Sequence, residues 1–216
     1  MMKDLKLGFA FMRYAPKKGI GSLAILFILL GFLNMDSVKH MLYIIGGYFL
    51  TLGPYMLVGM FQTVNMSNLV LSSPKKRKME VQVYTLINVV SVLIGFVLFS
   101  IILLIELWLN RCSPYYIGFV YTALAITYII HLISAALSYK HSILSSVITV
   151  IGLAAIIITC IQIPDHIQRS IHASLGISFA IVGIVIGSFA FLGITKLIYK
   201  TPMSKYTVKS MLQEMK

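Results

Sequence analysis

Residues 60–79 read MFQTVNMSNLVLSSPKKRKM and form the longest polar interruption between the apolar runs of the chain. The stretch closes with four consecutive basic residues, Lys75, Lys76, Arg77 and Lys78. Because Lys and Arg in short loops resist translocation, this cluster predicts a cytoplasmic loop between two membrane spans. The four basic side chains would lie at the membrane surface, close to anionic headgroups.

The first part of this loop has the periodicity of a short amphipathic helix outside the bilayer. Its defining residues recur at spacings of 3 and 4, namely Phe61, Val64, Asn65, Asn68 and Leu71. Ser72, Ser73 and Pro74 follow, and the proline is expected to end the helix. Two interpretations stay open: a docking element for a partner protein, or an ordinary loop whose charges set the topology.

Composition assigns the chain to the helical membrane proteins. Of its 216 residues 59% are hydrophobic and only 11% are charged, and the mean hydropathy is +0.93. Several runs exceed the roughly 18 uncharged residues that mark a spanning helix. The formal charge of +12 does not indicate nucleic acid, because the basic residues flank apolar runs and form no separate basic domain.

We therefore predict an all-α, polytopic membrane protein with a single transmembrane domain over residues 1–216. An interfacial amphipathic helix is expected at 1–18, with its Lys and Arg side chains directed toward phosphate. Six spans are expected at about 19–35, 41–60, 83–109, 115–139, 143–163 and 173–195. A cytoplasmic loop at 61–82 and a cytoplasmic tail at 196–216 complete the domain.

The distribution of Lys and Arg predicts which side each loop occupies. The N-terminal segment carries 5, the second loop 4, the fourth loop 1 and the tail 5, whereas the first, third and fifth loops carry 1 each. This asymmetry predicts that both termini are cytoplasmic.

Small residues form a stripe along the sixth span. They recur at spacings of 4, 3, 4 and 3, as Gly176, Ala180, Gly183, Gly187 and Ala190. Such a stripe lets another helix backbone approach closely, which is a main source of helix association in lipid. The partner helix could belong to the same bundle or to another subunit, and the pattern does not choose between them.

Residues able to carry chemistry are scarce, and we assign no catalytic residue and no metal ligand. His131 lies well inside the fourth span, where we expect a neutral imidazole hydrogen-bonded to a neighbouring helix. Glu106 lies near the end of the third span and is expected to reach outward to Arg111. Cys112 and Cys160 both map to the outer side, where a disulfide between them is possible in principle, although we expect them to stay unpaired.

The layout resembles the membrane subunits of type-2 ABC exporters, in particular small bacterial exporters of short amphipathic peptides. The local likeness is the loop from Phe61 to Leu71 with the following Ser-Ser-Pro-Lys-Lys-Arg, which matches that family's coupling helix. The resemblance implies a separate ABC ATPase subunit that binds ATP and Mg, with no cofactor in this chain. It also implies a second permease chain, identical or not, and a bacterial plasma membrane. Only 162–172 is available for the hairpin that the family carries between its last two spans.

Two alternatives remain. The chain could be the vitamin-binding membrane subunit of an energy-coupling-factor importer, with a small-molecule pocket open to the outside. It could also be an intramembrane enzyme or an assembly protein without transport activity, although no converging set of acids and histidines supports the enzyme.

Cysteine accessibility in intact cells tests the predicted topology. In a background lacking Cys112 and Cys160, Ser204→Cys and Lys75→Cys should not react with a membrane-impermeant thiol reagent, because both positions are predicted to be cytoplasmic. Labelling of either position from outside would refute the orientation.

Overall fold

The computed structural model describes residues 20–35, 40–65, 74, 76–138 and 140–201, and these ranges contain helices and no strand. The long helices are α2 (Ile20–Met35), α3 (His40–Asn65), α5 (Tyr84–Trp108), α6 (Ile117–Ser138), α7 (Ser142–Gln162) and α9 (Ala173–Ile198). Shorter segments are the π-helix η1 (Lys78–Val83), the 3-10 turn η2 (Pro114–Tyr116) and α8 (Asp165–Ser170). The predicted interfacial helix at 1–18 lies outside the described residues.

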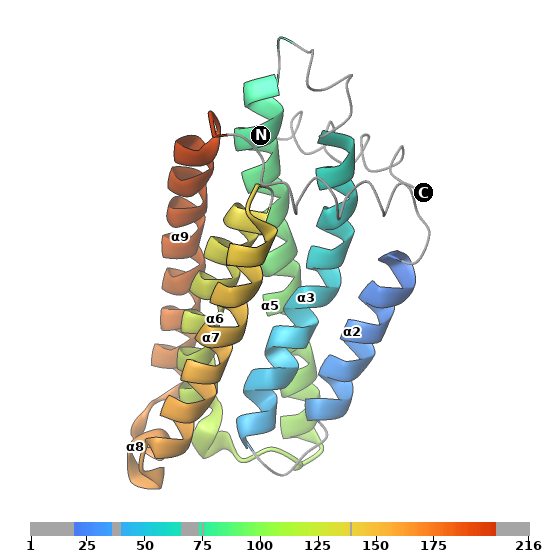
Figure 1. Ribbon diagram of the computed structural model, residues 1–216. Coiled ribbons are helices and arrows are strands. Elements are labelled where there is room, and N and C mark those ends of the chain that lie inside the picture. Colours follow the sequence, from blue (N-terminus) through green and yellow to red (C-terminus); the bar gives the residue numbers. More distant parts are fainter. Residues whose placement is uncertain (1–19, 36–39, 66–73, 75, 139, 202–216) are drawn as a thin grey trace.

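Successive long helices run up and down the bundle, so that Ile20 and Ile198 lie at the same end (Figure 1). Within the described ranges four segments are long and apolar enough to cross a membrane: Lys78–Trp108, Pro114–Ser138, Ser142–Gln162 and Ala173–Ile198. The described part of α2 is a shorter apolar helix. The all-α class is confirmed, and the four long apolar segments suggest a membrane-embedded protein; six spans remain a prediction.

Several boundaries differ from those expected. α3 continues to Asn65, beyond the expected end of the second span at 60, and α9 continues to Ile198, beyond 195. The third span was expected to begin at 83, but η1 leads directly into α5, so the continuous helical segment begins at Lys78. The side chains of Met79, Val81 and Val83 in η1 are buried in the bundle. Glu80 in the same segment is buried beside Lys76, whose Nζ lies 3.8 Å from Glu80 Oε1.

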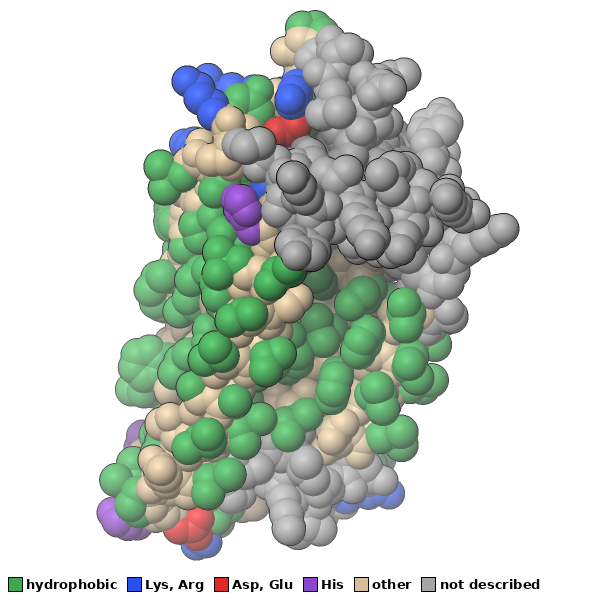
Figure 2. Space-filling view, in the orientation of Figure 1, with side chains coloured by type: hydrophobic (Ala, Val, Ile, Leu, Met, Phe, Trp, Pro, Cys, Tyr) green, Lys and Arg blue, Asp and Glu red, His purple; other side chains and the backbone are tan. Residues whose placement is uncertain are grey.

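α6 is the central helix of the bundle. It is the most deeply buried of the four long apolar segments, whereas α7 and α9 are largely exposed. It packs most extensively on α9, contacts α7 along its other side, and touches α3 and α5. α2 packs almost only on α3. Apolar side chains cover much of the outer surface over α2 and α7 (Figure 2), as expected of helices that face lipid.

The stripe of small residues on α9 faces α6 within the same chain. A Cβ atom added to Gly176 would lie 2.2 Å from the carbonyl oxygen of Gly118, and one added to Gly183 would lie 2.7 Å from that of Ala125. Ala180 is fully buried and Ala190 is half-buried. The helices α6 and α9 run in the same direction and approach backbone to backbone, which larger side chains would prevent.

At the basic end of the bundle, one lysine side chain forms hydrogen bonds with the residues that follow α9. Lys140, between α6 and α7, donates hydrogen bonds from Nζ to the carbonyl oxygens of Tyr199 and Thr201, the latter at 2.7 Å. A cation at these carbonyls also complements the negative end of the α9 dipole. Burial lowers the pKa of Lys140, and the negative charge of Glu80 acts against that shift. Lys76, Arg77, Lys78, Lys196 and Lys200 lie at the same end.

Alanine substitutions along α9 test the close contact with α6. Gly176→Ala should lower the free energy of unfolding by about 1–3 kcal/mol, because the new methyl group collides with backbone atoms that cannot move aside. Gly193→Ala is the matched control, since a Cβ at Gly193 meets nothing within 4 Å. Unfolding of the purified protein in mixed micelles measures both. Equal stability of the two variants would contradict the contact.

Candidate functional site

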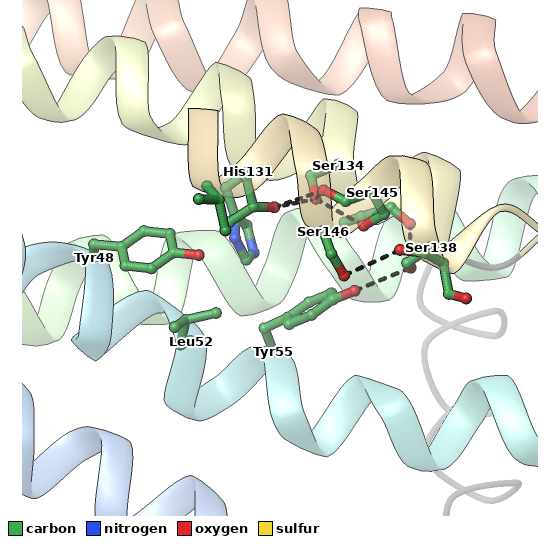
Figure 3. Close-up of a pocket in the computed structure, with 12 residues that line it drawn as sticks. Tyr48, Leu52, Tyr55, His131, Ser134, Ser138, Ser145 and Ser146 are labelled. Atoms are coloured by element: carbon green, nitrogen blue, oxygen red, sulfur yellow. Dashed lines mark hydrogen bonds between the residues drawn. The ribbon is translucent and has the colours of Figure 1, made fainter. Parts of the chain in front are cut away.

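A cavity of about 360 Å³ lies among α3, α6 and α7. Its volume falls within the ~300–1,000 Å³ typical of ligand pockets. Most of its walls are hydroxyl-bearing or aromatic (Figure 3). The lining consists of Tyr48, Leu52 and Tyr55 from α3; His131, Ser134, Ala135 and Ser138 from α6; and Ser142, Ser145, Ser146, Thr149 and Val150 from α7.

The cavity has the form of a groove because its two walls are separate. α3 and α7 both pack on α6 but scarcely contact each other, so α6 forms the floor between them. Between the described parts of α3 and α7 the groove therefore opens sideways, next to exposed apolar side chains of α7 such as Val147 and Ile151.

Hydroxyl groups fasten α7 to the floor of this groove. Ser134 on α6 pairs through its Oγ with the Oγ of Ser145 at 2.8 Å and with the Oγ1 of Thr149 at 2.5 Å. The Ser134 hydroxyl also lies 3.1 Å from the carbonyl oxygen of Ser145. Hydrogen bonds of this kind between helices in lipid contribute about 0.6–2 kcal/mol each. Since α7 is otherwise little buried, this cluster is a main attachment of the helix.

A second group of hydroxyls joins α3 and α5 to α6. The Oη of Tyr55 lies 3.1 Å from the Oγ of Ser138, and Tyr84 on α5 donates to the carbonyl oxygen of Ala135 at 3.0 Å. Ser138 also donates to the same carbonyl at 2.7 Å. The positions of the groove walls are thus set by polar contacts within an otherwise apolar bundle.

His131 lies between the two tyrosines of α3. Its ring meets those of Tyr55 and Tyr48 edge to face, with centroids 4.7 Å and 6.2 Å away. The side chain is 4% exposed, and its Nε2 has no hydrogen-bond partner among the described residues. The expected hydrogen bond from this histidine to a neighbouring helix is therefore absent at Nε2. An unpaired buried polar atom destabilises a fold by about 1–3 kcal/mol. A histidine at this position is therefore better explained by a role in binding than by stability.

The lining carries no full charge. None of its residues is Asp, Glu, Lys or Arg. Along the bundle the groove occupies the half that includes the end of α6 and the start of α7, next to Lys140. It therefore lies toward the basic end rather than toward α8 (Figure 1).

Most of these groove residues were not singled out by the sequence patterns. A signal was present: Ser142, Ser145, Ser146 and Thr149 recur at spacings of 3, 1 and 3, which places them on one face of an otherwise apolar helix. His131, Ser134 and Ser138 recur on α6 at spacings of 3 and 4. What periodicity does not reveal is that these two faces meet each other and α3.

The residues of the predicted coupling segment are described only in part. Phe61, Val64 and Asn65 belong to the last turns of α3, and Pro74 is an exposed turn residue. Asn68 and Leu71 lie outside the described residues, as does Lys75. Lys76, Arg77 and Lys78 form the start of the helix that continues through η1 into α5, where they are half-buried or exposed. A separate helix over the whole of 61–71 therefore stays a prediction.

The opposite end of the bundle carries a few polar groups of its own. Glu106 is buried, with an Oε2 that has no hydrogen-bond partner among the described residues, so it does not reach outward as expected. On the surface, Arg169 contacts Asp165 at 2.8 Å and donates to the hydroxyl of Tyr116 at 2.9 Å. Cys112 and Cys160 are free, and burial raises the pKa of the Cys112 thiol. Across the described ranges, no three His, Cys, Asp or Glu residues gather as metal ligands.

Replacing the imidazole tests the cost of its unpaired nitrogen. His131→Phe keeps a ring between Tyr48 and Tyr55 but removes the buried polar atom, so the free energy of unfolding should rise by about 1–3 kcal/mol. His166→Phe on α8 is the control, because its exposed side chain should change stability by less than about 0.5 kcal/mol. A destabilised His131→Phe protein would mean that the imidazole has a structural partner.

A scan against protein-family models, a search of curated proteins and a search of solved structures each found no match to this chain.

Proposed function

We propose that this protein is the membrane subunit of an ATP-driven exporter that takes amphipathic cargo into the groove formed by α3, α6 and α7. The observation that carries the proposal is the position of the groove. It lies in the half of the bundle next to the basic end, and by the positive-inside rule that half faces the cytoplasm. Cargo leaving a cell would enter from that side.

The sideways opening suits cargo that partitions into the membrane. An amphipathic molecule could keep its apolar body in lipid while a polar group enters between α3 and α7, where hydroxyl groups replace water. Short amphipathic peptides are the cargo that the family resemblance suggests. The importer alternative calls for a pocket open to the outside, and the groove lies in the other half of the bundle.

α3 provides the mechanical link that such an exporter needs. Tyr48, Leu52 and Tyr55 form one wall of the groove, and the same helix continues to Asn65, past Phe61, where the proposed coupling segment begins. A pull on that segment by a separate ABC ATPase would move α3 relative to the floor formed by α6. Pro54 lies inside α3 next to the groove and removes one helical hydrogen bond, which makes a bend there less costly.

In this proposal the working complex contains two permease chains and two ATPase chains in a bacterial plasma membrane. ATP and Mg bind only to the ATPase, and this chain supplies the cargo pathway. Phe61, Val64, Asn65, Asn68, Leu71 and Pro74 would meet the ATPase, while Lys75, Lys76, Arg77 and Lys78 set the depth of the segment at the headgroups.

Co-purification and transport test this assignment. The tagged protein, extracted from native membranes, should carry an ABC ATPase with it, and the complex in proteoliposomes should move an apolar peptide when ATP is added. Phe61→Asp with Val64→Asp should reduce ATP-driven transport at least tenfold while membrane insertion is retained, because charges at apolar contact positions oppose docking.

Gln82→Asp is the control for these changes, since Gln82 is exposed at the same end of the bundle and lies outside the proposed coupling segment. Full transport by the Phe61→Asp, Val64→Asp protein would overturn the coupling role. Absence of any ATPase from the purified complex would overturn the exporter itself.

A further inference from the structure

We propose that the groove selects an uncharged hydrogen-bonding group, an amide or a hydroxyl, carried on an apolar body, and that His131 Nε2 is its anchor. The inference deepens the proposed function by naming the class of cargo, and it rests on that function for its biological role. Binding itself can be measured on this chain without an ATPase.

The first step is the absence of charge from the groove walls. A carboxylate or ammonium group entering the groove would lose water and find no opposite charge among the lining residues. Among the Lys and Arg residues Lys140 is the nearest along the chain, but its Nζ donates to the carbonyl oxygens of Tyr199 and Thr201, just beyond the end of α9. A neutral polar group avoids this cost.

The second step is the unpaired nitrogen of His131. Other polar side chains of the groove floor are paired with a wall, as Ser134 is with Ser145 on α7 and Ser138 is with Tyr55 on α3. The Nε2 of His131 has no hydrogen-bond partner in the part of the chain that the structure describes. A neutral imidazole nitrogen either donates or accepts a hydrogen bond, depending on the tautomer. Amides and hydroxyls can both donate and accept, so they can pair with either tautomer.

The third step is the geometry around that nitrogen. The rings of Tyr48 and Tyr55 pack edge to face against the imidazole and fix its position in the free protein. Figure 3 shows these side chains together with Leu52 and the serines of α7 around one space. The nitrogen is buried in the free protein, so the side chains around it must shift to admit a ligand.

The fourth step concerns the apolar body of the ligand. Leu52 and Val150 line the groove itself, and Leu144, Val147 and Ile151 are exposed on α7. A ligand whose polar head lies at His131 would therefore keep its apolar part against these side chains or in the adjoining lipid. Burial of that part supplies affinity, whereas the head supplies selectivity.

Three dipeptides that differ only at their ends test the inference. The purified chain in lipid nanodiscs is titrated with radiolabelled acetyl-Leu-Leu-amide, which is neutral, with acetyl-Leu-Leu, which is a carboxylate, and with Leu-Leu-amide, which is an amine. The neutral probe should bind at least tenfold more tightly than either charged probe. Dioctanoylglycerol, a neutral lipid with one hydroxyl, is a fourth arm that distinguishes a lipid source of the same chemistry from a peptide source.

Variants at His131 test whether its side chain forms the hydrogen bond to the polar group of the ligand. His131→Phe should weaken binding of the neutral probe about tenfold, as expected for the loss of one buried hydrogen bond, and His131→Gln should restore much of it because its amide both donates and accepts. His166→Phe should bind as the wild type does. The side-chain 15N resonance of His131 should shift when the neutral probe is added.

The outcomes separate the two proposals. Equal binding of neutral and charged dipeptides, an unchanged dissociation constant for His131→Phe, or no saturable binding of either neutral probe would each overturn the ligand class. These results would leave the exporter standing if an ATPase co-purifies. Conversely, His131-dependent binding without any co-purifying ATPase would uphold the ligand class and overturn the exporter.

Discussion

Helices in lipid gain little free energy by moving apolar side chains away from acyl chains, because the acyl chains are equally apolar. Such helices associate instead through close packing and hydrogen bonds. In this protein the closest packing is between α6 and α9. Gly118 and Gly176 bring the two backbones together at one end, and Gly183 continues the contact against Ala125. Because α6 is the central helix, the position of the groove floor depends on this contact.

The hydroxyl groups around the groove connect its walls to its floor, whereas the glycines bring α6 and α9 together. Ser134, Ser145 and Thr149 connect α7 to α6, and Tyr55 with Ser138 connects α3 to α6. These contacts leave α3 and α7 almost free of each other. The floor is thus packed closely against α9 on one side, and each wall is joined to it by a few polar contacts.

The same arrangement explains why a polar groove is tolerated inside an apolar bundle. Nearly every hydroxyl near the floor has a partner on a neighbouring helix or on its own backbone, as Ser146 has in the carbonyl oxygen of Ser142. Among the buried side-chain atoms of the described groove lining, the Nε2 of His131 is the one without a partner. Stability alone would favour an apolar ring at that position, so the nitrogen is best understood through what it could bind.

Sequence alone determined the class of this protein and much of its helical order. In lipid, the backbone N–H and C=O groups of a long uncharged run are paired within an α-helix, so these runs predicted helices. The stripe of Gly176, Ala180, Gly183 and Gly187 identified a face for close packing. The tertiary structure decided which helix meets that face, and it is α6 of the same chain. It also decided that the polar faces of α6 and α7 meet beside Tyr48 and Tyr55, and that Glu106 is buried. Periodicity records which residues share a face of one helix, but the pairing of faces depends on packing between segments far apart in the chain, which no local pattern contains.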